Sequence, residues 1–184
     1  FTVEARDKSG KRLLASTRVV APVSSEMGCR GCHGGSWKRG VAGVSDETAI
    51  NILAAHDRNS GTSLLAEARA GMPALCQRCH ADPAVGARGD SLRLNFSAAM
   101  HGWHANYMHL EGAAACAACH PAKPDGPTRC ARDFHKEIGI TCAECHGTLE
   151  EHAMALLRGE EAKPRAAQLI NHLRSDQVAS AAEV

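Results

Sequence analysis

The residues of this chain that are best suited to chemistry are cysteines and histidines that recur in one short pattern. Cys-x-x-Cys-His occurs four times in 184 residues. Two thiols in one turn of chain can bond covalently to the two vinyl groups of a haem, and the histidine that follows can bind the iron. The pattern therefore predicts four covalently bound c-type haems. The predicted attachment residues are Cys29, Cys32, Cys76, Cys79, Cys116, Cys119, Cys142 and Cys145, and the predicted proximal ligands are His33, His80, His120 and His146.

Other uses of paired cysteines fit this spacing less well. A single Cys-x-x-Cys can be half of a zinc site or a thioredoxin-like redox pair. The four motifs lie farther apart than the paired motifs of ordinary zinc ribbons, and zinc does not require a histidine directly after every second cysteine. Haem attachment is therefore the favoured interpretation over zinc, and over disulfides within the motifs.

Seven histidines lie outside the motifs and are candidates for the second axial ligand of each iron. Methionine is the rival ligand and raises the reduction potential, but the chain has only 5 Met against 11 His. The surplus predicts two histidines on every iron and low potentials. Five candidates compete for four positions, so one is either idle or binds a haem outside this chain. The candidates are His56, His101, His104, His135 and His152, with His109 and His172 as weaker ones that have surface or hydrogen-bonding roles.

His101 and His104 lie three residues apart, in a segment predicted to be helical, and so share one face of that helix. The axial ligands of one iron must lie on opposite sides of its porphyrin ring, so these two are predicted to serve two neighbouring haems. Gly102 between them is expected to let a porphyrin edge come close.

Composition narrows the function further. The formal net charge is +1, which does not favour nucleic-acid binding. The chain has no run of 18 apolar residues, and Phe1–Glu4 does not have the pattern of a signal peptide. Haem attachment takes place outside the cytoplasm, so we expect an exported, mature or trimmed chain. Only 3% of the residues are aromatic, and we expect porphyrins to form the core that such side chains usually build.

The expected fold is mainly α and irregular, with short helices and loops wrapped round a chain of four haems. Residues 1–24 are predicted to form a β-hairpin segment that turns at Asp7–Gly10 and ends at Pro22, and residues 25–184 a tetrahaem domain. The hairpin either folds back on its own domain or offers an open edge to another chain. Helices are predicted at 45–56, capped by Ser45 or Asp46, and at 62–70, 97–108, 148–158 and 165–179. The segment 121–128 is predicted to be a loop.

Cys130 is the ninth cysteine and has no partner within the motifs. In an oxidising compartment such a residue pairs with another chain, has lost its partner from a removed segment, or is a buried free thiol. The sequence leaves these three alternatives open.

The chain resembles the multihaem c-type cytochromes, through its four motifs and the segment His101-Gly102-Trp103-His104. More narrowly, Pro22–Met27 and Cys145–Ala153 are similar to segments of the extracellular cytochromes of metal-respiring prokaryotes. Some tetrahaem members of that group polymerise into conductive filaments with bis-histidine haems, where one distal histidine comes from the next subunit. The resemblance implies electron transfer, and homopolymerisation through haem stacking and the N-terminal strand.

The expected function is therefore that of an extracellular or periplasmic electron carrier rather than an enzyme. Its partners would be other redox proteins or an extracellular acceptor, with no nucleic acid and no membrane span. The alternative is a small reductase of nitrite, hydroxylamine or a sulfur oxyanion. That function needs one haem with an open position and a nearby acid or base such as His109 or Lys136. A membrane-anchored electron donor is a third, weaker alternative.

Overall fold

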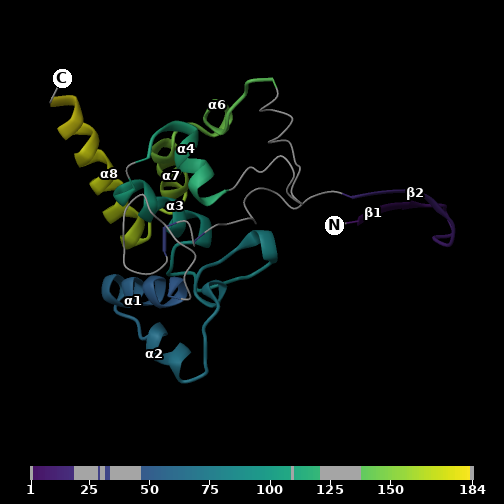
Figure 1. Ribbon diagram of the computed structural model, residues 1–184, viewed down its shortest axis with the longest axis horizontal. Helices are drawn as coiled ribbons and strands as arrows, with labels where there is room; N and C mark the ends of the chain where they lie inside the picture. Colours follow the sequence, from purple (N-terminus) through teal and green to yellow (C-terminus); the bar gives the residue numbers. More distant parts are fainter. Residues whose placement is uncertain are drawn as a thin grey trace.

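The computed structural model describes residues 2–18, 29, 32–33, 47–108, 110–120 and 138–182. Within this part of the chain the protein is mainly helical, with one small antiparallel sheet. Figure 1 shows the helices gathered on one side, while the N-terminal hairpin projects away from them. This agrees with the predicted fold class in its helices and its hairpin. Several residues singled out from the sequence lie outside the described residues, namely Pro22, His109, Cys130, His135, Lys136 and the segment 121–128.

The hairpin is built from β1 (Thr2–Arg6) and β2 (Leu13–Arg18), which pair antiparallel as predicted. Asp7 organises the turn between them. Its Oδ1 accepts hydrogen bonds from the backbone N–H and the hydroxyl of Ser9 and from the backbone N–H of Lys11. These bonds, with that of the Ser9 side chain first, lower the pKa of Asp7. Gly10 closes the turn at φ +72°, which glycine adopts without steric cost.

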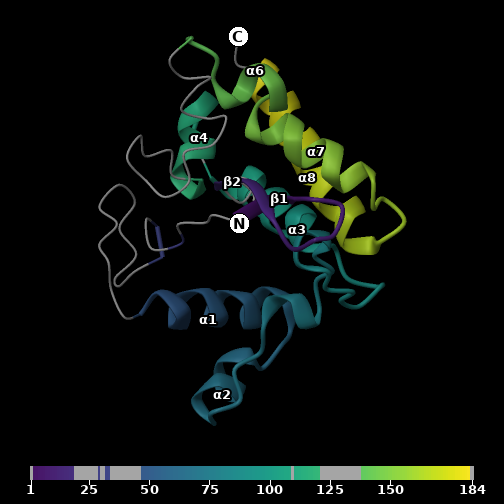
Figure 2. The same cartoon turned by 90° about the vertical axis from the view of Figure 1, so that its right-hand side faces the viewer.

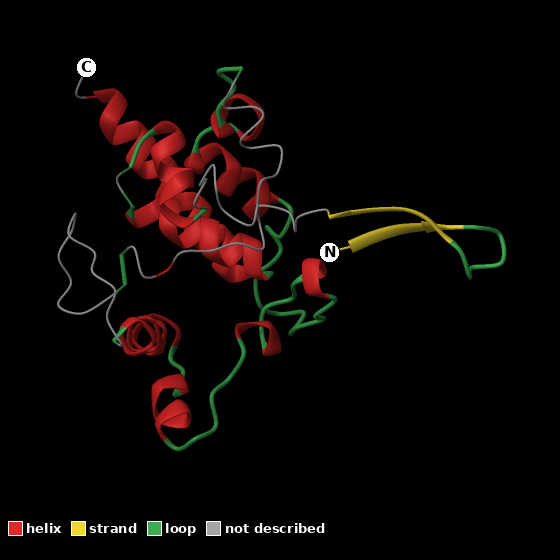
Figure 3. Cartoon of the chain, turned by 45° about the vertical axis from the view of Figure 1, so that its right-hand side comes forward, coloured by secondary structure: helices red, strands yellow, loops and turns green. Residues whose placement is uncertain are grey.

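The helices α1 (Thr48–Ser60) and α2 (Leu64–Arg69) form the next unit, and they contact each other. The first runs four residues past the predicted end at His56. The prediction of its cap is wrong, because the N-cap is Glu47 rather than Ser45 or Asp46, which themselves lie outside the described residues. Residues 61–63 connect these two helices, which Figure 3 shows apart from the larger group of helices.

Three helices pack together to form the apolar core: α3 (Phe96–Tyr107), α7 (Leu149–Arg158) and α8 (Pro164–Ala182). The predicted capping box at Thr148 and Glu151 is present, and α7 begins and ends where the sequence predicts. Apolar residues recur every four positions along α7, so one face of it is buried. The buried residues of this core include Ala98, Leu149, Ala153, Leu157, Leu169, Ile170 and Leu173.

An aliphatic core is present among the described residues, and the expectation that porphyrins form the core stays a prediction. Leu157 and Ile170 are almost wholly buried although the described residues contain few aromatic side chains. Gly102 has a different role from the one predicted. A Cβ placed on Gly102 would lie 2.9 Å from Leu157 Cδ2, so the glycine lets α7, rather than a porphyrin edge, approach α3 closely.

Four short elements were not predicted from the sequence. They are the helices α4 (Gly112–Cys119) and α6 (Cys142–His146) and the 3-10 turns η3 (Cys76–Arg78) and η4 (Pro83–Val85). Three of them contain motif cysteines, which shows that these motifs themselves form helical turns. None of the described helices is long and apolar enough to cross a membrane.

The close contact of α3 with α7 gives a stability prediction. We expect Gly102→Ala to lower the free energy of unfolding by about 1 kcal/mol, because overpacking costs about 1–3 kcal/mol and the better helix propensity of alanine returns up to about 1 kcal/mol. Chemical denaturation measures the change. In a Leu157→Ala background the new methyl group has room, and Gly102→Ala should then be neutral or stabilising. An equal loss in both backgrounds would contradict the contact.

Candidate functional site

We number the candidate sites by their motifs in chain order: site 1 is Cys29–His33, site 2 is Cys76–His80, site 3 is Cys116–His120 and site 4 is Cys142–His146. The eight motif cysteines are all free thiols. Both sulfur atoms of each motif are therefore available for covalent attachment. The described residues contain no group of three or more His, Cys, Asp or Glu side chains arranged to hold a bare metal ion.

In three sites the motif histidine faces one of the predicted distal histidines. The ring centres of His33 and His104 lie 6.3 Å apart, those of His80 and His56 6.3 Å apart, and those of His120 and His101 6.1 Å apart. The rings of the first two pairs are nearly perpendicular, at 81° and 82°, and those of the third nearly parallel, at 14°. His101 and His104 thus face two different motifs.

This spacing fits the residues to an iron held between two imidazoles. A metal–imidazole bond is about 2 Å long, and the centre of an imidazole ring lies about 1 Å beyond the bonded nitrogen, so two axial rings have centres about 6 Å apart. Aromatic rings in direct contact also have centres about 4.5–7 Å apart, so the distance alone does not require an atom between the rings. The three separations are compatible with an iron held between two imidazoles, and the Cys-x-x-Cys-His motifs give the reason to place one there.

Site 4 has a different arrangement. The ring of His152 lies 5.6 Å from that of His146 and 4.7 Å from that of His101, nearly perpendicular to both. His152 follows His146 by six residues and is carried on α7, directly after the capped start of that helix. It therefore lies between site 3 and site 4. His135, the other candidate for this region, is outside the described residues.

Four histidines of these pairs have their Nδ1 atom beside an oxygen atom. His80 Nδ1 lies 2.7 Å from the carbonyl oxygen of Leu94, and His56 Nδ1 lies 2.9 Å from Thr62 Oγ1. On α3, His101 Nδ1 lies 2.9 Å from the carbonyl oxygen of Ser97, and His104 Nδ1 lies 2.7 Å from that of Met100. A carbonyl oxygen can only accept, so Nδ1 carries the proton and Nε2 is left with the lone pair that binds a metal.

Thr62 and Asp57 support His56 in a way that the sequence analysis missed. The Thr62 hydroxyl donates to Asp57 Oδ1 at 2.6 Å, so its oxygen is free to accept from His56 Nδ1–H. The same carboxylate accepts the backbone N–H groups of Leu64 and Leu65 at the start of α2. These bonds, with that of Thr62 first, lower the pKa of Asp57 and keep it charged. The corner between α1 and α2 therefore fixes the orientation of the His56 ring.

Burial favours the neutral form of several of these histidines. Desolvation is the main cause that lowers the pKa of His33, His56, His101 and His152, and neighbouring histidines lower it further. A neutral imidazole is the form that binds a metal. The environment of the rings therefore suits metal ligation at neutral pH.

The cysteines show which motifs are neighbours. Burial raises the pKa of Cys116, and a hydrogen bond with Cys142 raises it further. Burial also raises the pKa of Cys119, as do the nearby thiols of Cys32 and Cys29. Site 3 therefore lies beside both site 1 and site 4.

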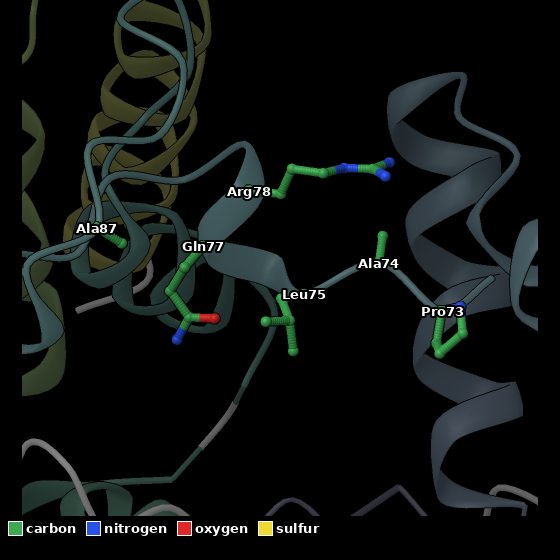
Figure 4. Close-up of a pocket in the computed structure, with 6 residues that line it drawn as sticks. All are labelled: Pro73, Ala74, Leu75, Gln77, Arg78 and Ala87. Atoms are coloured by element: carbon green, nitrogen blue, oxygen red, sulfur yellow. The ribbon is translucent and has the colours of Figure 1, made fainter.

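Site 2 has both of its cysteines exposed and a hollow beside it. Cys76 and Cys79 are exposed, and a hollow of about 430 Å³ lies beside their 3-10 turn. Figure 4 shows its lining residues, with Arg78 extending across the gap toward the neighbouring helices. The Arg78 guanidinium lies 3.2 Å from Glu67 Oε2 of α2, which ties the motif to the α1–α2 unit.

His172 has a structural environment on α8. Its Nδ1 lies 2.6 Å from Asn106 Oδ1, and the buried Asn106 donates to the carbonyl oxygen of Gly102 at 2.7 Å. The His172–Asn106 bond joins α8 to α3, and the Asn106–Gly102 bond lies within α3 and holds the amide in place. The predicted hydrogen-bonding role of His172 fits this environment.

The chain was compared with protein-family models, with curated proteins and with solved structures, and no match was found.

The link between Thr62 and His56 gives a prediction. Thr62→Val removes both the acceptor of His56 Nδ1–H and the donor to Asp57 Oδ1. We expect a loss of about 1–3 kcal/mol in the free energy of unfolding, since one hydrogen bond is usually worth about 0.5–1.5 kcal/mol net. The ring ¹⁵N spectrum of the fully reduced protein should show the proton on Nδ1 of His56 before the substitution and a disturbed signal after it. Thr62→Ser keeps the hydroxyl and should keep both properties. Identical behaviour of the two variants would contradict the assignment.

Proposed function

We propose that this protein is an electron carrier that holds four covalent c-type haems, with histidine on both faces of most or all of them. The observation that supports this best is the set of three motif histidines that each face a predicted distal histidine, with ring centres 6.1–6.3 Å apart. The free thiols of the motifs and the Nδ1 hydrogen bonds of the ligand candidates add to it.

The cysteines and histidines would have different roles in holding the haems. The motif cysteines would anchor the haems, and the pairs His33–His104, His80–His56 and His120–His101 would hold three of their irons. When bound, the irons supply one-electron oxidation and reduction. Neutral, oriented imidazoles on both faces leave no position for a substrate and favour low potentials, which suits a carrier rather than an enzyme.

Site 4 supports a second candidate function. His152 contacts both His146 and His101, and the His146–His152 separation of 5.6 Å is shorter than that of the three other pairs. If His152 does not bind the iron of site 4, that iron is the one able to take a small ligand. A reductase of nitrite, hydroxylamine or a sulfur oxyanion would use this site.

We further propose that the protein works outside the cytoplasm, where c-type haems are attached, and that the hairpin joins copies of it into a filament. Within the described residues β1 and β2 pair only with each other, so each strand has an outer edge that can accept another strand. The hairpin also projects away from the helices (Figure 1), where such an edge is accessible.

The haem-loaded protein tests the proposed function directly. We expect its mass to exceed that of the polypeptide by four haems and the electron paramagnetic resonance (EPR) spectrum of the oxidised protein to contain only low-spin signals. Fewer than four covalent haems would contradict the proposal. A high-spin signal from one haem would favour the reductase.

Substitution of the ligand candidates sharpens the same test. His101→Ala and His104→Ala should each convert one haem to high spin, and a different haem in each variant. His172→Ala is the matched control, since this histidine faces Asn106 rather than a motif, and it should leave the spectrum unchanged. A variant at His101 or His104 that keeps all four haems low-spin would remove that residue from the ligand set.

The hairpin proposal has its own prediction. Negative-stain electron microscopy of the haem-loaded protein should show filaments, and removal of residues 1–18 should leave discrete particles, with at least a tenfold loss of filament length. The haem spectrum of the shortened protein should be unchanged. Filaments that persist without these residues would exclude the hairpin as the joining element.

A further inference from the structure

We propose that the four haem sites are arranged in space in the order site 2, site 1, site 3, site 4, which differs from their order in the sequence. This inference rests on the proposed function, since it concerns the route of electrons between the haems. It makes site 2 and site 4 the two ends of the route, where electrons enter and leave. Three links between neighbouring sites support it.

The first link is α3, which joins site 1 to site 3. His104 faces His33 of site 1, and His101 faces His120 of site 3. These two residues are three positions apart on one helix, an axial rise of about 4.5 Å. Sites 1 and 3 are therefore direct neighbours, although the whole of site 2 lies between them in the sequence.

The second link is the ring of His152, which joins site 3 to site 4. It contacts His101 of site 3 at 4.7 Å and His146 of site 4 at 5.6 Å. The helices that carry the two motifs, α4 and α6, also contact each other. Sites 3 and 4 are therefore neighbours whichever iron His152 binds.

The third link is α1, which joins site 2 to site 1. The Thr48 hydroxyl, at the start of α1, donates to the backbone carbonyl of His33 in site 1. His56 lies eight residues farther along α1, about 12 Å by the helical rise, and faces His80 of site 2. One helix therefore contacts site 1 at its start and site 2 near its end.

The arrangement of the helices agrees with this order. In both Figure 1 and Figure 2, α1 lies below α3, while α4 and α6 lie above it. Site 2, beside α1, and site 4, on α6, are therefore on opposite sides of α3. Site 2 is also bordered by exposed apolar residues, with Leu75 exposed to 76% and Leu92 to 79%. Such a surface suits a redox partner that docks at one end of the route.

Replacing one histidine ligand by methionine at site 1 or at site 2 distinguishes the proposed spatial order from the order in the sequence. Methionine raises the reduction potential of a haem. With a chemical reductant and mediators that set the solution potential below that of the altered haem and above those of the others, only site 1 is reduced in His104→Met and only site 2 in His56→Met. A reduced low-spin iron has no unpaired spin, so the EPR signals of its direct neighbours lose their magnetic coupling.

In the proposed order, reduction of site 1 changes the signals of two other haems, and reduction of site 2 changes the signal of one. If the haems were arranged in sequence order, reduction of site 1 would change the signal of one other haem and reduction of site 2 the signals of two. That result would overturn the proposal. His172→Met should change none of them.

The unmodified protein provides an independent measurement if a variant does not fold. In the fully reduced, diamagnetic state, nuclear Overhauser contacts between haem substituents should join site 2 to site 1, site 1 to site 3, and site 3 to site 4. Contacts of site 2 with site 3 or site 4 in place of site 1 would overturn the order. Failure of the proposed function is distinct from either outcome, because it would appear as missing covalent haem in the mass spectrum.

Discussion

The contact of α3 with α7 and α8 is the constraint on which the candidate sites depend. Leu157 packs on Gly102, and the buried Asn106 links α3 to His172 of α8. These contacts hold α3 in place, and α3 carries the histidines that face site 1 and site 3. The aliphatic core therefore fixes the positions of the His101 and His104 imidazoles relative to the motif histidines that they face. In the proposed function, the polypeptide sets the positions of the imidazoles that would bind the haem irons.

The hydrogen bonds at Nδ1 show how the chain orients the imidazole rings of the candidate ligands. On α3 each acceptor is the backbone carbonyl four residues earlier in the same helix, so the helix itself orients His101 and His104. At site 2 the orienting groups come from elsewhere: Leu94 for His80 and the Thr62–Asp57 pair for His56. The α3 histidines therefore depend on local structure, and the site 2 histidines on tertiary structure.

The sequence predicts the parts of this molecule that depend on local pattern. The hairpin turn at Asp7, the end of α2 at about residue 70 and the capping box of α7 follow from short-range chemistry, and the structure contains all three. The helices α4 and α6 were missed, although the alanine-rich segment before Cys116 and the pair Thr141 and Glu144 were signals for them. The haem interpretation of the motifs stays a prediction, as does each distal ligand.

What the sequence could not predict is which histidines face each other. His33 and His104 lie 71 positions apart in the sequence (104 − 33), and their meeting depends on how α3 packs. Thr62 was missed for the same reason, because its role exists only once the corner between α1 and α2 has formed. Gly102 was assigned to the wrong neighbour, since a glycine pattern indicates close approach but not by what.

The placement of His101 and His104 on one helix has a consequence for thermal motion. A helix moves largely as a rigid rod, so a fluctuation that displaces α3 carries both imidazoles together. The separation between their two irons would then vary less than it would if the ligands came from independent loops. Electron tunnelling falls steeply with distance, and this middle step would therefore keep a nearly constant rate while the rest of the chain fluctuates.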